Sequence, residues 1–451
     1  MKLLNIIIYE LRHFVRSKSK LYSYLFFVFT CCYSIHIGFS LYNSQNSNIK
    51  SLQEMENENI SQVIKWFKTG EKGPKEKDWV DITDPYWSLR YTPKYVVKNP
   101  SPLMPLGLGQ SEQYGYHKKI TIWSSPYDSD VIEEISNYER FINGNIDFSF
   151  LIIFLLPLLV IIFTYNINGL EKDLNFDKLI AVQTGSVKYW VIGRLIFYWI
   201  ILVSTINIFI LSVFYLNNVN INDGFDLIKL SNLYVTVFFI AFYYVIMSSS
   251  SSTVIAFKMI SIWLFLCVLI PGSVHQYVSL KYPPNFMTDF LDANRKETYA
   301  VFKLPKEELY RQMLSIYADL DTTKQGLDSL INTKITRNTM SCIVNQINVQ
   351  AINIIEEQNN FKNNLIRSTY WFNPISYFQN KWNKLTSTDY YAYKDFRDNI
   401  QLVTNKKLKI LAFECWNERT VNLNLYNEYL KKLHSYNSSP NLEMITYEAI
   451  K

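Results

Sequence analysis

Histidine, cysteine and acidic side chains, from which a catalytic or metal site would be built, are scattered along this sequence. The five histidines lie far apart and show no HxxxH or HxxE spacing. They are His13, His36, His117, His275 and His434. No GxxxxGK[ST] motif occurs, which excludes nucleotide binding through a P-loop. The segment GLGQ at 107–110 has too few glycines for a dinucleotide-binding turn and predicts a simple turn. We therefore expect no catalytic residue, no metal and no cofactor in this chain.

The cysteines indicate packing rather than chemistry. Cys31 and Cys32 are adjacent within an apolar stretch and Cys267 lies in another, where thiols act as small hydrophobic groups. Cys342 and Cys415 fall in a polar region. For these two the sequence leaves a disulfide and two free thiols as alternatives.

Long uncharged runs of residues form the elements that would hold any functional side chains in place. The mean hydropathy of −0.03 would suit a soluble protein, but the apolar residues are clustered. Runs of this length predict an α-helical polytopic membrane protein with five transmembrane helices. They lie at 21–42, 148–168, 189–216, 231–250 and 253–272. A secretory signal peptide is the alternative for the first run, but its apolar core is long and no A-x-A site follows it.

The remaining segments are polar. Residues 1–20 predict an amphipathic, basic helix in the membrane surface, and their five Lys and Arg residues place the N-terminus in the cytoplasm. Residues 43–147 and 273–451 predict two extracytoplasmic domains, the first mixed α/β and the second mainly helical. Residues 169–188 then form a cytoplasmic segment and residues 217–230 a short outer loop. The net charge of +6 is too small and too dispersed for a nucleic-acid partner.

Three residues inside the apolar runs are candidates for a role in the membrane. His36 either anchors the first span at the interface or takes part in transport. Pro157 is tolerable in mid-span if neighbouring helices satisfy the carbonyl that it frees. Lys258 lies near one end of the fifth span, where its ammonium group can reach the interface. Asp147 opens the second span and is expected to stabilise that helix N-terminus.

The order of these segments resembles the ABC-2 type permease family, the membrane subunits of ATP-binding-cassette exporters, in the subgroup with large extracytoplasmic domains. Four stretches carry the resemblance. They are YELRHFVRSKSKLYSYLFF, the second span with NGLEKDLNFDKLIAVQTGSVK, SSSSSTVIAFKMISIWLFLCVLIPGSV, and FNPISYFQNKWNKLTSTDYYAYKDFRDNI. Glu171 matches an acidic position of the family, whereas Asn175, Phe176 and Asp177 replace its usual Gly-Thr pattern.

The resemblance implies a function that the residues alone do not. It implies an exporter subunit with two outer domains, paired with a second copy or a paralogue in the bacterial inner membrane. ATP and Mg would be bound by a separate ABC ATPase, and an envelope protein is a further expected partner. The ATPase would contact the chain through Glu10, Arg12, Gly169, Glu171, Lys172 and Asp173. The family has six spans, so a sixth is expected to be truncated or absent after residue 441.

The substrate is left open, with a lipid-linked, peptide or amphipathic cargo favoured over a small ion. Two rival functions also remain. One is a mechanotransmitter that relays ATPase motion to an envelope partner and transports nothing. The other is a membrane-anchored scaffold.

Overall fold

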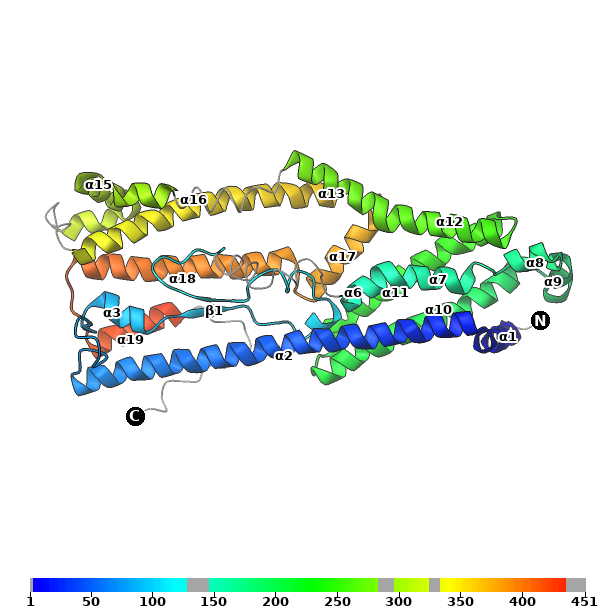
Figure 1. The fold of residues 1–451 in the computed structure, drawn as a ribbon, viewed down its shortest axis with the longest axis horizontal. Helices are drawn as coiled ribbons and strands as arrows, with labels where there is room; N and C mark the ends of the chain where they lie inside the picture. The colour runs from blue at the N-terminus through cyan, green and yellow to red at the C-terminus, as the bar shows by residue number, and fades with distance from the viewer. Residues whose placement is uncertain (1–2, 128–145, 283–295, 324–332, 435–451) are drawn as a thin grey trace.

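The first apolar run does not end in a turn. In the computed structural model, which describes residues 3–127, 146–282, 296–323 and 333–434, helix α2 runs unbroken over the 52 residues of Lys18–Thr69. At 1.5 Å per residue it is about 78 Å long, and in Figure 1 it spans nearly the whole molecule. Gly70, with φ of 71°, ends it in the left-handed conformation typical of helix C-termini. The first part of 43–147, predicted as the start of an outer domain, is therefore the far half of the first apolar helix.

The described elements divide between a bundle of apolar helices and a polar domain. The bundle and its N-terminal end contain α1 (Leu3–Arg16), α2, α6 (Phe148–Phe150), the π turn η2 (Leu151–Leu155), α7 (Leu156–Thr164), α8 (Gly169–Asp173), α9 (Asp177–Thr184), α10 (Val187–Leu216), α11 (Ile221–Ser248), α12 (Ser252–Leu264), the π turn η3 (Phe265–Leu269) and α13 (Ile270–Lys281). The polar domain contains the far half of α2, α3 (Pro85–Tyr91), β1 (Tyr95–Val97), η1 (Met104–Leu106), β2 (His117–Lys119), α15 (Lys306–Ile316), η4 (Ala318–Thr323), α16 (Thr333–Ser368), α17 (Pro374–Leu385), α18 (Tyr390–Trp416) and α19 (Leu423–His434).

Five helices in the described ranges are long and apolar enough to cross a membrane. They are Lys18–Thr69, Phe148–Asp173, Val187–Leu216, Gly224–Ser248 and Ser252–Lys281. The prediction of five α-helices with the length and apolar composition of membrane spans is thus confirmed for the described residues. The stretch at 441–451, where the resemblance places the start of a sixth span, lies outside the described residues.

The fifth apolar helix continues past the end predicted for it at Pro271 and Gly272. Pro271 lacks an N–H and its ring would clash with the carbonyl four residues earlier. The chain relieves both problems with the π turn η3 just before the proline, and α13 then continues to Lys281. Pro271 therefore does not end this helix.

Pro157 shows the same arrangement, with η2 before it. The carbonyl four residues earlier belongs to Ile153, and the Tyr234 hydroxyl of α11 donates to it at 2.5 Å. The next carbonyl, of Phe154, accepts from Trp263 Nε1 of α12 at 3.1 Å. The expectation that neighbouring helices satisfy the freed backbone is confirmed, and these bonds join three apolar helices.

Asp147 caps the helix that begins the second apolar run, as predicted. Its carboxylate accepts from Phe150 N at 2.7 Å. It also accepts from Leu108 N at 3.0 Å, which ties the GLGQ turn to the same helix end. Gly109 in that turn has φ of 49°, and a Cβ there would lie 2.6 Å from Thr388 Oγ1. The turn is therefore packed between the bundle and the loop that joins α17 to α18.

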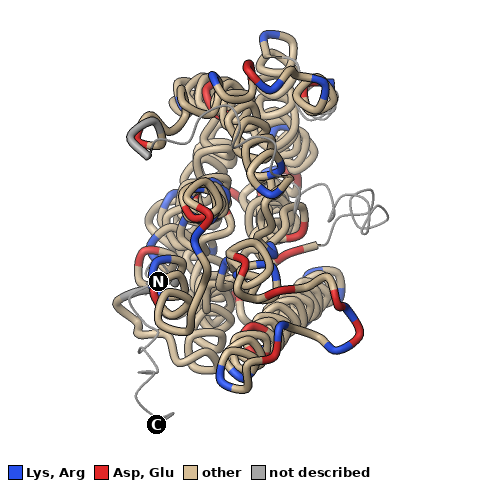
Figure 2. Tube along the Cα trace, turned by 90° about the vertical axis from the view of Figure 1, so that its left-hand side faces the viewer, with Lys and Arg blue, Asp and Glu red and all other residues tan. Residues whose placement is uncertain are grey.

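The two polar segments form one domain with a shared core, rather than the two domains expected. Val63 and Leu89 from the first segment pack in one cluster with Leu309, Ile343 and Leu411 from the second. Backbone pairing joins them as well, since Val421 N donates to Thr83 O at 2.7 Å. The sheet content of the described residues is small: β1 pairs antiparallel with β2. Figure 2, which looks at the molecule end-on, shows positive and negative residues interspersed.

Cys342 and Cys415 both lie in this domain as free, buried thiols. Burial raises the pKa of each to about 12, so both stay protonated. Of the two alternatives left by the sequence, the structure has the free thiols.

Lys407 of α18 is a buried cation whose titration should affect stability. Its Nζ donates to Ile120 O at 2.9 Å. Burial, with the nearby charges of Lys119 and Arg90, lowers its pKa from 10.5 to about 8. The unfolded chain therefore binds more protons between these values, and the free energy of unfolding should rise with pH from about 8 to 10.5.

In Lys407→Met that rise, roughly 3 kcal/mol at most, is expected to be absent. Chemical denaturation of the detergent-solubilised protein across this pH range measures it. Lys409→Met is the control, because Lys409 is exposed on the same helix. A Lys407→Met variant with the pH profile of the wild type would contradict the assignment.

Candidate coupling site

A buried ionic cluster lies at the end of the bundle where α1 and the N-terminus of the chain are. Helix α1 positions Glu10, the first residue of this cluster. Ile6, Glu10 and Phe14 follow one another at four-residue spacing, and all three are buried. Helix α1 crosses α10 at Gly193, where a Cβ would come within 2.9 Å of Ile6 Cγ2. The Phe14 ring packs edge-on against Phe163 of α7. The glycine thus allows a close crossing that carries Glu10 into the interior.

The structure differs from the prediction for Glu10, which the resemblance made a contact of the ATPase. Leu4, Leu11 and Val15 of the apolar stripe are exposed, as in a helix that lies in a membrane surface, but Glu10 has no exposed surface. Glu10 is therefore a buried structural anion and cannot contact a docked ATPase as predicted. A buried partner decides its orientation, because an uncompensated charge could not occupy that place.

Arg194 of α10 is that partner. Its Nε donates to Glu10 Oε2 at 2.5 Å and its Nη1 donates to Glu171 Oε1 of α8 at 2.5 Å. The side chains of Arg194 and Glu171 are only 5% and 13% exposed. One guanidinium thus joins α1, α8 and α10. Glu171, predicted as a contact of the ATPase, is mostly buried and ion-paired with Arg194.

Lys20 of α2 completes the cluster. Its Nζ donates to Tyr198 OH at 2.8 Å and to Phe163 O at 2.7 Å, and lies 3.8 Å from Glu10 Oε1. The Tyr198 hydroxyl in turn donates to Glu10 Oε1. Two cations, Lys20 and Arg194, thus face two carboxylates. This balance matters because the desolvation of a buried charge is offset only when it is paired and hydrogen-bonded.

The electrostatics of Glu10 follow from these contacts. Burial raises its pKa, but the interaction with His13 and the charge of Arg194 outweigh burial and lower the pKa to about 2. Glu10 is therefore ionised at neutral pH. The stability that it contributes is complete above its ordinary pKa of 4.5 and is lost as the pH falls toward 2.

Helix α8 is also attached to the turn between α11 and α12. Lys172 Nζ donates to Ser249 O at 2.6 Å, and Asp173 Oδ2 accepts from Ser252 N at 3.2 Å. Gly169 allows this contact, since a Cβ there would lie 2.6 Å from Ser252 Cα. The break predicted between the spans 231–250 and 253–272 is confirmed, because α11 ends at Ser248 and α12 begins at Ser252.

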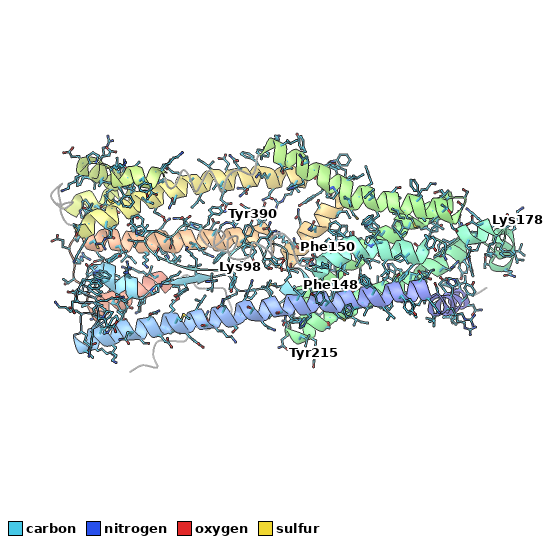
Figure 3. All side chains as sticks on the ribbon, viewed as in Figure 1. Lys98, Phe148, Phe150, Lys178, Tyr215 and Tyr390 are labelled. Carbon is cyan, nitrogen blue, oxygen red and sulfur yellow. The ribbon has the colours of Figure 1, made fainter. Side chains whose placement is uncertain are left out.

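Beyond α8 the chain presents apolar side chains with no cover. None of the α9 residues is buried. Leu179 and Val182 of α9 are 55% and 83% exposed, and Leu174 and Phe176 before it are 54% and 53% exposed. We call these four residues the tip. Figure 3 places Lys178 of α9 at this extreme end of the molecule, and Figure 1 shows α1 beside it.

The structure brings five of the predicted coupling residues to one end: Glu10, Gly169, Glu171, Lys172 and Asp173. Arg12 lies there too, on the exposed side of α1. The three membrane candidates lie elsewhere. His36 and Lys258 are exposed on α2 and α12, and Pro157 is buried in α7. No three His, Cys, Asp or Glu side chains gather as a metal site among the described residues.

Sequence reasoning missed Lys20, Arg194 and Tyr198. A usable signal existed for one of them, because Arg194 is the single charged residue in the run 189–216. A lone charge in such a run calls for a buried partner. Its partner could not be named, since Glu10 lies 184 residues earlier in the chain.

No family model matches this chain, and no curated protein or solved structure is similar enough to it to count as a match. The arguments for its function therefore rest on its own residues and geometry, together with the order of its sequence motifs.

Proposed function

We propose that this chain is the membrane subunit of an ABC exporter, driven by a separate ATPase that docks on the tip. One observation carries the proposal: an exposed apolar surface lies next to helix α8, which an ion pair fixes to the bundle. Leu174, Phe176, Leu179 and Val182 are exposed at the end of the bundle. Just behind them, Glu171 is fixed by Arg194. Apolar side chains beyond the ends of membrane helices are typical of a protein-binding surface.

The geometry supports transmission of a push at the tip. Through Arg194, helix α8 is tied to α1 and α10, and through Lys172 and Asp173 it is tied to the serine turn. Movement of α8 would therefore shift these elements together as a rigid body. ATP, with Mg, would be bound and hydrolysed in the partner, and this chain would do no catalysis itself.

The proposal also includes an orientation of the chain in the membrane and the positions of its partners. The N-terminus and the tip would face the cytoplasm, and the polar domain would lie outside the inner membrane of a bacterium. The five lysines and arginines in residues 1–20 favour this orientation. The exposed stripe of α1 would rest in the membrane surface. A second copy or a paralogue would complete the transport path, and an envelope protein would contact the polar domain.

The double variant Leu179→Asp/Val182→Asp tests the docking surface. Carboxylates at these two exposed positions should abolish the apolar contact while leaving the fold unchanged. Losing a central contact costs about 2 kcal/mol, so we expect ATPase affinity to fall roughly thirtyfold or more. Co-purification of the chain with a P-loop ATPase encoded beside it, followed by titration, measures this change.

Ile354→Asp is the matched control for that experiment. Ile354 is 58% exposed, close to the 55% of Leu179, but it lies on α16 in the polar domain. The control should bind the ATPase as the wild type does. Equal ATPase affinity for the tip variant and the wild type would overturn the proposed docking site.

A mechanotransmitter is the second candidate, and one observation favours it. Helix α2 continues without a break from the ionic cluster at Lys20 to Thr69 in the polar domain. A continuous helix of this length could carry motion directly to an envelope partner. ATP-dependent movement of cargo in proteoliposomes distinguishes the two candidates, because only the exporter would produce it.

A further inference from the structure

Helix α17 and the residues before it present aromatic side chains to the outside of the molecule. Trp371 is 86% exposed, Tyr377 is 42% exposed and Phe372 is 38% exposed. Their rings contact neighbouring aromatic rings, with Trp371 packed edge-on against Phe372. Exposed aromatic residues grouped in this way need a partner of matching chemistry.

The opposite face of α17 is built into the apolar bundle. Ile375, Phe378 and Trp382 are buried and belong to the same hydrophobic cluster as the membrane helices. The ring centroid of Phe378 lies 4.8 Å from that of Tyr234 on α11. Helix α17 is thus not one of the five apolar helices, yet it is fixed to them. Figure 1 shows it running obliquely between the end of the bundle and the polar domain.

Other exposed aromatic residues occur where the apolar helices meet the polar domain. Tyr215 at the end of α10 is 83% exposed, and Phe150 at the start of the second apolar helix is 46% exposed. Figure 3 shows both near the middle of the long axis, close to the start of the polar domain. Aromatic side chains gathered at one level around a bundle are typical of a membrane–water interface.

Cations lie beside the aromatic residues on α17. Lys381 and Lys384 are exposed on the part of the helix nearer the polar domain. A helix with one buried apolar face, exposed aromatic residues at one end and lysines at the other has the composition of an interfacial helix. Lysines in such helices reach the headgroup phosphates, while aromatic rings sit at the acyl boundary.

We infer that residues 371–384 are seated in the lipid headgroup layer of the leaflet nearest the polar domain. Trp371 and Phe372 enter the boundary between headgroups and acyl chains, and Lys381 and Lys384 bind lipid phosphate. Lipid is favoured over a protein partner because the buried face of α17 is continuous with the membrane helices. The inference rests on the membrane location of the five apolar helices and not on ATPase docking. The outcome of the co-purification and titration with the ATPase therefore does not affect it.

Site-directed spin labelling of the full chain tests the inference. Trp371→Cys is prepared with Cys32→Ser, because Cys32 is the one exposed cysteine among the five. The labelled protein is placed in vesicles of phosphatidylethanolamine and phosphatidylglycerol. Its accessibility to oxygen and to a water-soluble nickel chelate gives the depth of the label. We expect a depth of about 5–10 Å into the headgroup and acyl boundary.

Trp79→Cys is the matched control. Trp79 is an exposed tryptophan, 68% accessible, in the loop between α2 and α3 at the far end of the polar domain. Its label should meet the nickel chelate freely. Tyr377→Cys is a second labelled site on α17 and should also be accessible to oxygen from the lipid.

Two outcomes overturn the inference. Labels at 371 and 377 that behave like the label at 79 would place α17 in water. Labels shielded from both oxygen and the nickel chelate would show that a second copy or another protein covers the helix.

Discussion

Replacement of Arg194 by methionine is expected to destabilise the protein by about 3–5 kcal/mol. The guanidinium bonds both Glu10 and Glu171. Its removal leaves Glu10, which has no exposed surface, with Lys20 at 3.8 Å, the Tyr198 hydroxyl and His13 as its remaining contacts. The cost therefore comes mainly from a buried carboxylate that has lost its partner, rather than from lost packing.

Lys188→Met is the matched control, because it removes one positive charge from an exposed position on the same helix. The midpoint of thermal unfolding in detergent compares the two variants. Adding Glu10→Gln to Arg194→Met should recover part of the loss, since one of the orphaned charges disappears. Similar stability of Arg194→Met and Lys188→Met would show that the cluster contributes little.

Trp382→Ala is expected to cost about 3–5 kcal/mol and to loosen the polar domain from the bundle. Trp382 is fully buried. Its Nε1 donates to Leu106 O at 2.8 Å, and its ring centroid lies 6.2 Å from that of Phe148. One side chain therefore joins α17, the η1 segment and the start of the second apolar helix. Its loss removes packing from all three and leaves the Leu106 carbonyl without this donor.

The matched control for this variant is Trp371→Ala, three residues before α17 and largely exposed. In detergent the control should unfold at nearly the wild-type temperature. Limited proteolysis gives the second measurement: cleavage between η1 and the second apolar helix should become faster in Trp382→Ala only. Equal unfolding temperatures and equal cleavage rates for the two variants would contradict the role assigned to Trp382.

Several features were predictable because they depend on neighbouring residues alone. The apolar helices follow from the length of their uncharged runs. The cap at Asp147 follows from a carboxylate just before a helix, and the break at Ser248–Ser252 from a run of small hydroxyl residues. It was also predictable that neighbouring helices would bond the carbonyl freed by Pro157, but the donors Tyr234 and Trp263 were not predictable.

The face of α1 could not be predicted from periodicity. Its most apolar stripe pointed one way, and the buried face with Glu10 points another. An ion pair with a residue 184 positions away decides between them, and no local pattern contains that information. The same holds for the polar domain, because each polar segment supplies only part of a shared core.

The sequence by itself therefore determined that the described residues include five helices apolar enough to cross a membrane. Only the tertiary structure decided that Arg194 pairs with Glu10, which is buried, and with Glu171, which is partly buried. It also decided that α2 continues into the polar domain, that two polar segments share one core, and that α17 returns to the bundle. The physical reason is the range of the forces involved: helix formation and apolar length are local, whereas charge pairing and core packing join residues far apart in the chain.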